Sequence, residues 1–174
     1  REDVVRRLRP GHPIVKLLAT ALVTESYEPE WIAVGPSVGP PEMTAAAAKL
    51  AYEAASLGPQ DLDLVLLHDS WINEELEYYE QLGLCDVGDA EKLVEEGATA
   101  LGGRIPVSTD GGLVGRGHPI GPTGLAQVHE IALQLSGRAE GRQVDGARTA
   151  LAHLVGGGSS AIVSLFQREK SQPS

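Results

Sequence analysis

The chain has 174 residues, of which 42% are hydrophobic and 22% charged, and its net charge at pH 7 is −10. This length and hydrophobic content predict a globular protein with one sizeable core, or one half of a duplicated fold, and exclude a disordered chain. The acidic balance offers no basic face for nucleic acid. The single cysteine, Cys85, excludes an internal disulfide framework, and no apolar run is long enough to span a membrane. We therefore expect a cytoplasmic protein.

The order of the predicted elements indicates an α/β fold in which helices cover both faces of a mixed β-sheet. Runs of apolar and β-branched residues predict strands, and apolar residues at three- and four-residue steps predict helices. In chain order we expect a strand (14–25), a helix (41–57), a buried parallel strand (61–69), a helix (71–83), a short acidic helix (89–97), a helix that begins near Pro122, and two strands (147–155 and 160–167).

These elements are expected to form one domain over residues 14–167. Residues 1–13 are expected to be an N-terminal connecting segment, and residues 168–174 a disordered tail. Within the domain, polar residues that can carry chemistry gather at three places, each at the end of a predicted element.

The first place is the tripeptide His68-Asp69-Ser70, which follows the buried strand. Ligands of α/β sheets bind at the carboxyl ends of strands, so this position favours a functional site. The alternative is a structural role, in which the His68 ring is hydrogen-bonded and Asp69 caps the next helix.

The second place is His118, within the stretch DGGLVGRGHPIGPTG at residues 110–124. Glycine permits a left-handed backbone and the close approach of a ligand. The helix expected from Pro122 places a partial positive charge beside the imidazole, which favours the neutral form that accepts a proton from a thiol or a hydroxyl. The alternative is a loop histidine with a structural hydrogen bond.

The third place is the glycine turn (Gly156, Gly157 and Gly158) between the last two strands, close to His153. Exposed glycine N–H groups can stabilise an oxyanion. A tight hairpin is the alternative interpretation.

The other histidines and the cysteine carry weaker signals. His12, His129 and Cys85 are expected to be structural, because none of them lies at a strand end or in a glycine-rich frame. The sequence contains no metal-binding spacing of the HExxH or EF-hand kind.

Taken together, HDSW, GGLVGRGHPIGPTGLAQ and HLVGGGSSA, in this order and spacing, resemble the C-terminal half of the thiolases. The likeness is greatest to the lipid-transfer or sterol-carrier-protein type within the acetyl-CoA acetyltransferase family. It extends from about Ile14 to Phe166 and includes LGPQDLDLVLLHD, YEQLGLC and GGRIPVSTDGGL. The resemblance implies a thiolase-like half, one of two similar α/β halves packed as alternating layers of helix and sheet.

The resemblance also implies a reaction and residue roles. Thiolases cleave or form carbon–carbon bonds on acyl-coenzyme A by Claisen chemistry, through a cysteine thioester. His118 would deprotonate that cysteine and help hold the thioester oxygen. His68 and Asp69 would help build a first oxyanion hole, the glycine turn would contribute an N–H to a second, and Ser70 would line the substrate site.

Two departures from the thiolase pattern are visible. No residue of this chain matches the nucleophilic cysteine, so an N-terminal half would supply it and this chain by itself would be inactive. The acid/base cysteine is also missing, because Ser70 and Leu154 stand at the two positions where thiolases carry it. A serine hydroxyl is a far weaker acid than a thiol, whose pKa is about 8.5.

The partners implied by the resemblance are an N-terminal thiolase half, from the same gene or as a second chain, an acyl-CoA substrate, and a second copy in a homodimer. It implies no metal and no separate cofactor, since coenzyme A enters with the substrate, and it points to lipid or steroid metabolism. Two alternatives remain open. One is a thiolase-like retro-aldolase acting on acyl-CoA side chains, in which tyrosines replace the thiol acids; the other is a non-catalytic half-thiolase binding subunit.

Overall fold

The computed structural model describes residues 3–4, 7, 13–24, 41–157 and 159–169. Some of the expectations above fall outside the described residues, namely those for His12, Gly158, most of the connecting segment and residues 170–174 of the tail.

The described helices and strands alternate along the chain much as the sequence predicts. They are β1 (Val15–Thr24), α2 (Pro41–Ala55), β2 (Leu64–Leu66), α3 (Ile72–Gln81), α4 (Ala90–Glu95), α5 (Gly112–Arg116), α6 (Thr123–Leu135), β3 (Thr149–Gly156) and β4 (Ser160–Arg168). Across the described residues, no helix has both the length and the apolar character needed to cross a membrane.

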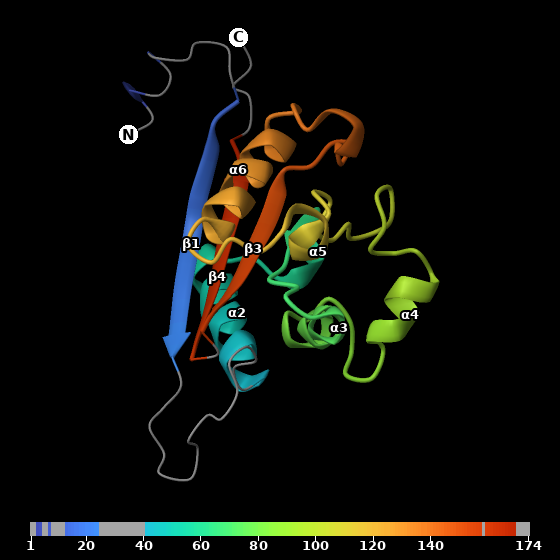
Figure 1. The fold of residues 1–174 in the computed structure, drawn as a ribbon. Helices are drawn as coiled ribbons and strands as arrows, with labels where there is room; N and C mark the ends of the chain where they lie inside the picture. Colours follow the sequence, from blue (N-terminus) through green and yellow to red (C-terminus); the bar gives the residue numbers. More distant parts are fainter. Residues whose placement is uncertain (1–2, 5–6, 8–12, 25–40, 158, 170–174) are drawn as a thin grey trace.

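The sheet is mixed, as expected, with the strand order β1-β4-β3-β2. β4 runs antiparallel to both of its neighbours, and β2 runs parallel to β3. Figure 1 shows α2 and α6 on opposite faces of this sheet, α2 against β1 and β4 and α6 against β3. The predicted α/β class with helices on both faces is therefore confirmed.

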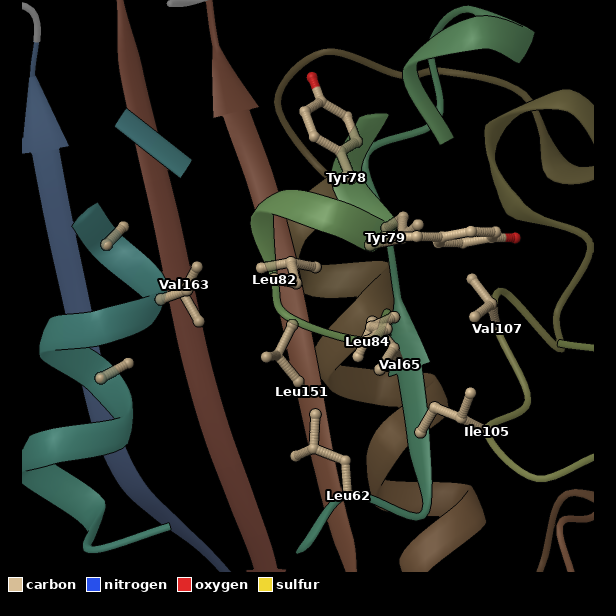
Figure 2. Packing of buried hydrophobic residues seen from close by; sticks show 14 of the residues in the cluster. Leu62, Val65, Tyr78, Tyr79, Leu82, Leu84, Ile105, Val107, Leu151 and Val163 are labelled. Carbon is tan, nitrogen blue, oxygen red and sulfur yellow. The ribbon is translucent and has the colours of Figure 1, made fainter. Parts of the chain in front are cut away.

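Alternating side chains of the central strands supply two separate cores. On β3, Leu151 faces the larger core beneath α2 and α3, whereas Ala150 and Ala152 face the smaller core beneath α6. This is the two-residue period of a strand buried on both faces. Figure 2 shows Leu151 of the larger core beside Leu82 and Leu84.

Three details differ from the sequence prediction. In α2 the buried face follows Met43, Ala47 and Ala51, whereas Leu50, which the apolar three- and four-residue pattern of the sequence would place on the inner face, is half exposed. The strand expected over 61–69 pairs only over Leu64–Leu66. Helix α5 lies within the glycine-rich stretch, where no helix was expected, because glycine lowers helix propensity.

Helix α6 has an inverted polarity. Its inward face carries the polar residues Thr123, Gln127, Glu130 and Gln134 together with Ile131 and Leu135. Its outward face carries apolar residues, since Leu125 is 72% exposed and Val128 is 41% exposed. Buried polar side chains need hydrogen-bond partners. The partners of these inward residues therefore show which neighbouring segments α6 is bonded to.

Gln127 joins α6 to the ends of two strands. Its Nε2 donates to the carbonyl oxygen of Leu67 at 3.0 Å and to that of His153 at 2.9 Å. Leu67 directly precedes His68, and His153 lies just before the glycine turn. One amide group therefore fixes the start of α6 relative to the carboxyl ends of β2 and β3; we refer to these two bonds as the Gln127 clamp.

Gln134 makes a comparable set of bonds at the other end of α6. Its Nε2 donates to the Arg142 carbonyl at 2.7 Å, and its Oε1 accepts from the Val144 N–H at 2.8 Å. The neighbouring Glu130 carboxylate accepts two hydrogen bonds from the Arg142 Nε and one from its Nη2. These bonds fasten the loop that leads into β3, far along the helix from the histidines.

His153 is fully buried in the carboxyl-terminal half of β3. Its Nε2 lies 3.0 Å from the Thr44 Oγ1 of α2, and its ring packs edge-on against Tyr78 at a centroid distance of 4.3 Å. Burial, with a smaller contribution from the charge of His68, lowers the pKa of His153 to about 3. The imidazole is therefore neutral at physiological pH.

We predict that replacing Gln127 or Gln134 by leucine destabilises the protein similarly, while only Gln127→Leu disturbs the histidines at the strand ends. Each substitution leaves buried carbonyl groups without a donor, which costs about 2 kcal/mol of unfolding free energy. Urea unfolding measures that cost, and the NMR resonances of the His68 and His118 rings report their surroundings. Unchanged resonances in a folded Gln127→Leu variant would contradict the clamp.

We predict that the His153 imidazole makes the protein less stable in acid. Its folded-state pKa lies below the unfolded value of about 6.5, so the unfolded chain binds a proton that the folded chain does not. The stabilisation is complete above about pH 6.5 and is lost as the pH falls towards 3. Between pH 7 and pH 4, wild-type protein should lose about 3 kcal/mol more than His153→Gln does in urea unfolding. Parallel curves for the two proteins would refute the assignment, and the exposed His129→Gln serves as the control.

Candidate active site

A cavity of about 380 Å³ opens at the carboxyl ends of β2 and β3. It collects residues from the three places that the sequence analysis singled out, together with an apolar rim. The lining residues are His68, Ser70, Trp71, His118, Ile120, Leu154, Val155, Gly156 and Gly157. Two predicted site residues differ: Asp69 does not line the cavity, and Gly158 lies outside the described residues.

The loop between α5 and α6 fixes the protonation pattern of the His118 ring. Gly117 adopts φ +83°, a left-handed conformation that glycine tolerates, and it turns the chain into His118. The Thr123 hydroxyl donates to the Pro119 carbonyl at 2.8 Å, and the Nδ1 of His118 lies 3.1 Å from the same hydroxyl oxygen. Because the hydroxyl proton is already engaged, Nδ1 must be the donor in this pair. A neutral His118 therefore carries its lone pair on Nε2.

His68 follows β2 and lies beside His118. The two rings meet edge to face, with centroids 4.8 Å apart. Burial, reinforced by the nearby His118 and opposed by a backbone hydrogen bond, lowers the pKa of His68 to about 4. A buried neutral imidazole beside a second imidazole supplies one N–H donor and one acceptor. The His68 Nδ1 has no hydrogen-bond partner among the described residues.

Asp69 points away from the cavity and holds the glycine-rich loop. Its Oδ1 accepts from the Leu113 N–H of α5 at 3.0 Å, and burial raises the pKa of its carboxyl. A Cβ atom at Gly112 would overlap this carboxylate, and Gly112 has φ +59°, so only glycine fits. The alternative in which Asp69 caps the next helix is wrong, because its partner belongs to α5 and not to α3.

The residue that caps α3 is Glu74, which the sequence analysis did not identify. Its Oε2 accepts from the Trp71 N–H at 3.1 Å and from the Ser70 hydroxyl at 2.7 Å. A glutamate three residues into a helix is a known capping signal, so the spacing from Trp71 could have identified the cap. The bond to Ser70 brings this buried carboxylate into contact with a residue that lines the cavity.

The glycine turn and two large apolar side chains complete the cavity. Gly157 has φ +60°. Leu154 lines the cavity and lies close to Gly124 at the start of α6. Trp71 is 57% exposed and Ile120 is 89% exposed, so both present apolar surface at the opening. The remaining candidates lie elsewhere: His153 is buried behind the wall, and Cys85 packs half-buried against the larger core.

The arrangement has the parts of a site for a polarised carbonyl group. The Nε2 of His118 is a proton acceptor, the neutral His68 is a candidate hydrogen-bond donor, and backbone of the glycine turn lies within the same hollow. A base and donors that converge on one point are the requirement for acyl chemistry.

Comparison with known proteins agrees with this geometry. The family model described as "Thiolase C-terminal domain-like" matches residues 32–168. "Sterol carrier protein 2" of Oryctolagus cuniculus is 40% identical over 169 residues, which is 95% of this chain and 30% of that protein. "Acetyl-CoA acetyltransferase" of Methanothermobacter thermautotrophicus is 42% identical over 128 residues, which is 73% of this chain and 33% of that protein. The chain thus spans about a third of the length of these curated relatives.

A solved structure has the same fold. A chain of the "Ltp2-ChsH2(DUF35) aldolase" superposes with a TM-score of 0.75 at 23% identity and covers 95% of this chain and 43% of its own length. At this identity the likeness concerns the fold alone. The family match over most of the chain, together with the strand-end histidines and the glycine-rich loop, establishes that this chain belongs to the thiolase C-terminal domain-like family.

Proposed function

We propose that this chain is the C-terminal half of a thiolase-like acyl-CoA acyltransferase, whose nucleophilic cysteine comes from an N-terminal half. The observation that carries the proposal is the Thr123 bond to His118, which leaves the Nε2 of His118 free to accept a proton beside the cavity. A thiol has a pKa of about 8.5, so a neutral imidazole placed against it raises the fraction of reactive thiolate.

The proposed reaction has two stages. In the first, His118 takes the proton of the cysteine, the thiolate attacks the acyl-CoA carbonyl to form a thioester, and coenzyme A leaves as its thiol with the proton that His118 took. The developing oxyanion is stabilised by N–H donors around the cavity, namely His68 and the backbone at Gly157. In the second, in the direction of synthesis, the enolate of another acyl-CoA attacks the carbonyl of the cysteine thioester, so that a carbon–carbon bond forms and the cysteine leaves as a thiolate. The reverse reaction breaks this bond. The pKa of His68 is low, so its ring is neutral. The N–H of a neutral imidazole can donate a hydrogen bond to the oxyanion without giving up its proton.

The outward face of α6 supports the second half as a partner. Leu125 and Val128 are exposed on this helix, Ile120 is exposed on the loop that precedes it, and Val114 is exposed on α5. These apolar side chains adjoin the opening of the cavity through Ile120, which also lines it. The chain spans about a third of the length of its relatives. Contact with the proposed N-terminal half would remove this exposed apolar face from water.

The alternatives have less support. The likeness to the aldolase structure, at 23% identity, concerns the fold alone, and no tyrosine lines the cavity among the described residues. A purely binding role leaves the fixed His118 tautomer without a purpose. The acyltransferase proposal uses both features. A cytoplasmic location, a homodimer and an acyl-CoA of lipid or steroid metabolism are part of the same proposal.

We predict that His118→Ala abolishes acylation of the partner's cysteine. The chain is combined with a cysteine-bearing thiolase N-terminal half, acyl-CoA is added, and the acyl adduct is followed by mass spectrometry. Loss of a general base lowers the rate by about 10²- to 10⁴-fold. Co-purification of the two halves is the control, since His118 contributes little to either core. Acylation at the wild-type rate in an assembled His118→Ala complex would refute the base role.

A second prediction concerns the His118 tautomer and needs no partner. In the ¹⁵N-labelled chain, long-range ¹H–¹⁵N correlations of the neutral His118 ring should show Nδ1 protonated and Nε2 bare. Thr123→Val keeps the shape of the side chain but removes the acceptor, so the signals should move towards a mixture of tautomers. Observation of a protonated Nε2 in the wild-type chain would contradict the proposed base.

A further inference from the structure

We propose that Ser70 and Glu74 form a hydroxyl–carboxylate relay that moves the proton on the carbon next to the thioester carbonyl. This inference rests on the proposed acyltransferase function and assigns the acid/base step for which thiolases use a second cysteine. The positions of that cysteine hold Ser70 and Leu154 here, and Leu154 has no group that can carry a proton.

The geometry of the pair is direct. The Ser70 hydroxyl donates to the Glu74 Oε2 at 2.7 Å, and Ser70 lines the cavity with His68 and His118. Glu74 is four residues further along and lies on the buried side of α3, with none of its surface exposed. Trp71 also lines the cavity and bonds Glu74, but through its backbone N–H. Among the described contacts of Glu74, the Ser70 hydroxyl is therefore the one side-chain link between the carboxylate and the cavity.

The surroundings of Glu74 make it a stronger base than an exposed glutamate. Burial raises the pKa of its carboxyl, the nearby Glu77 raises it further, and the hydrogen bonds from Ser70 and Trp71 lower it in part. The other carboxylate oxygen, Oε1, is buried and has no hydrogen-bond partner among the described residues. Capping α3 requires only one acceptor oxygen, which could lie at the surface. The role of Glu74 as a cap therefore does not explain why its whole carboxylate is buried.

The proton transfer balances without a free alkoxide. As the C–H bond of the substrate breaks, its proton goes to the Ser70 Oγ while the Ser70 hydroxyl proton goes to the Glu74 Oε2. The electron pair of the C–H bond becomes the enolate, whose oxygen faces the donors near His68 and Gly157. In the reverse direction Glu74 returns its proton to Ser70, and Ser70 delivers one to carbon. A lone serine cannot do this, because its alkoxide is too strong a base to form near neutral pH.

Deuterium exchange separates this step from acylation. The complex of this chain with its cysteine-bearing half is incubated with acetyl-CoA in D₂O, and both cysteine acylation and deuterium entering the acetyl group are measured. Ser70→Ala and Glu74→Gln should each lower the ratio of exchange to acylation, measured in the same sample, by about 10²-fold. Glu74→Gln keeps an oxygen for the Trp71 N–H, so the cap is retained. Glu75→Gln is the matched control, because Glu75 bonds to the Tyr79 hydroxyl away from Ser70.

A substitution of Ser70 by cysteine distinguishes a relay from a structural role of Glu74. A thiol ionises near neutral pH without help, so in the Ser70→Cys background Glu74→Gln should lower exchange less than about 3-fold. If Glu74 had only a structural role, Glu74→Gln would lower exchange by the same factor in the Ser70 and Ser70→Cys backgrounds. Equal costs, or unchanged exchange in Ser70→Ala with normal acylation, would overturn the relay alone. Absence of acylation in the wild-type complex would overturn the proposed function and the relay with it.

Discussion

The Gln127 clamp is the interaction on which the candidate site depends. One side-chain amide donates to the carbonyl groups of Leu67 and His153, which stand at the carboxyl ends of two neighbouring strands. The same helix begins with Thr123, whose hydroxyl holds the His118 ring. Because both protons of the amide are used inside a dry core, the helix cannot slide along the sheet without leaving buried polar groups unpaired. His68, His118 and the glycine turn therefore keep a common position although they are far apart in the chain.

The glycine-rich loop works with this clamp through its backbone. Gly112 lets the Asp69 carboxylate approach the Leu113 N–H, and Gly117 turns the chain so that His118 reaches Thr123. Neither contact stabilises the core greatly, but together they convert a segment of high conformational freedom into a rigid support. Asp69 acts here through the loop that it anchors, which explains why a buried carboxylate next to the site does not face the cavity.

Helix α6 has polar residues on its buried side and exposed apolar residues on its outer side, and both sides bear on the site and on a proposed partner. Helix α6 buries Thr123, Gln127 and Gln134 and exposes the apolar Leu125 and Val128. Ile120, on the loop that precedes the helix, lines the cavity. The residues that build the site and those that fit a partner thus share one helix. This arrangement is consistent with the proposed half-domain whose chemistry is completed by a second half.

The sequence by itself determined the α/β class, the order of the elements and the three places where chemistry gathers. Strand and helix periods are local properties, and the motifs around His68, His118 and the glycine turn are continuous in the chain. Only the tertiary structure decided that Asp69 serves α5, that Thr123 sets the His118 tautomer, that His153 lies behind the cavity wall and that Glu74 meets Ser70. Helix α5 and the buried polar face of α6 were also beyond the sequence patterns. Some of these contacts join residues that are distant in sequence, such as Asp69 and Leu113. Others join near neighbours, such as Ser70 and Glu74, whose meeting inside the protein depends on the local backbone conformation and on burial.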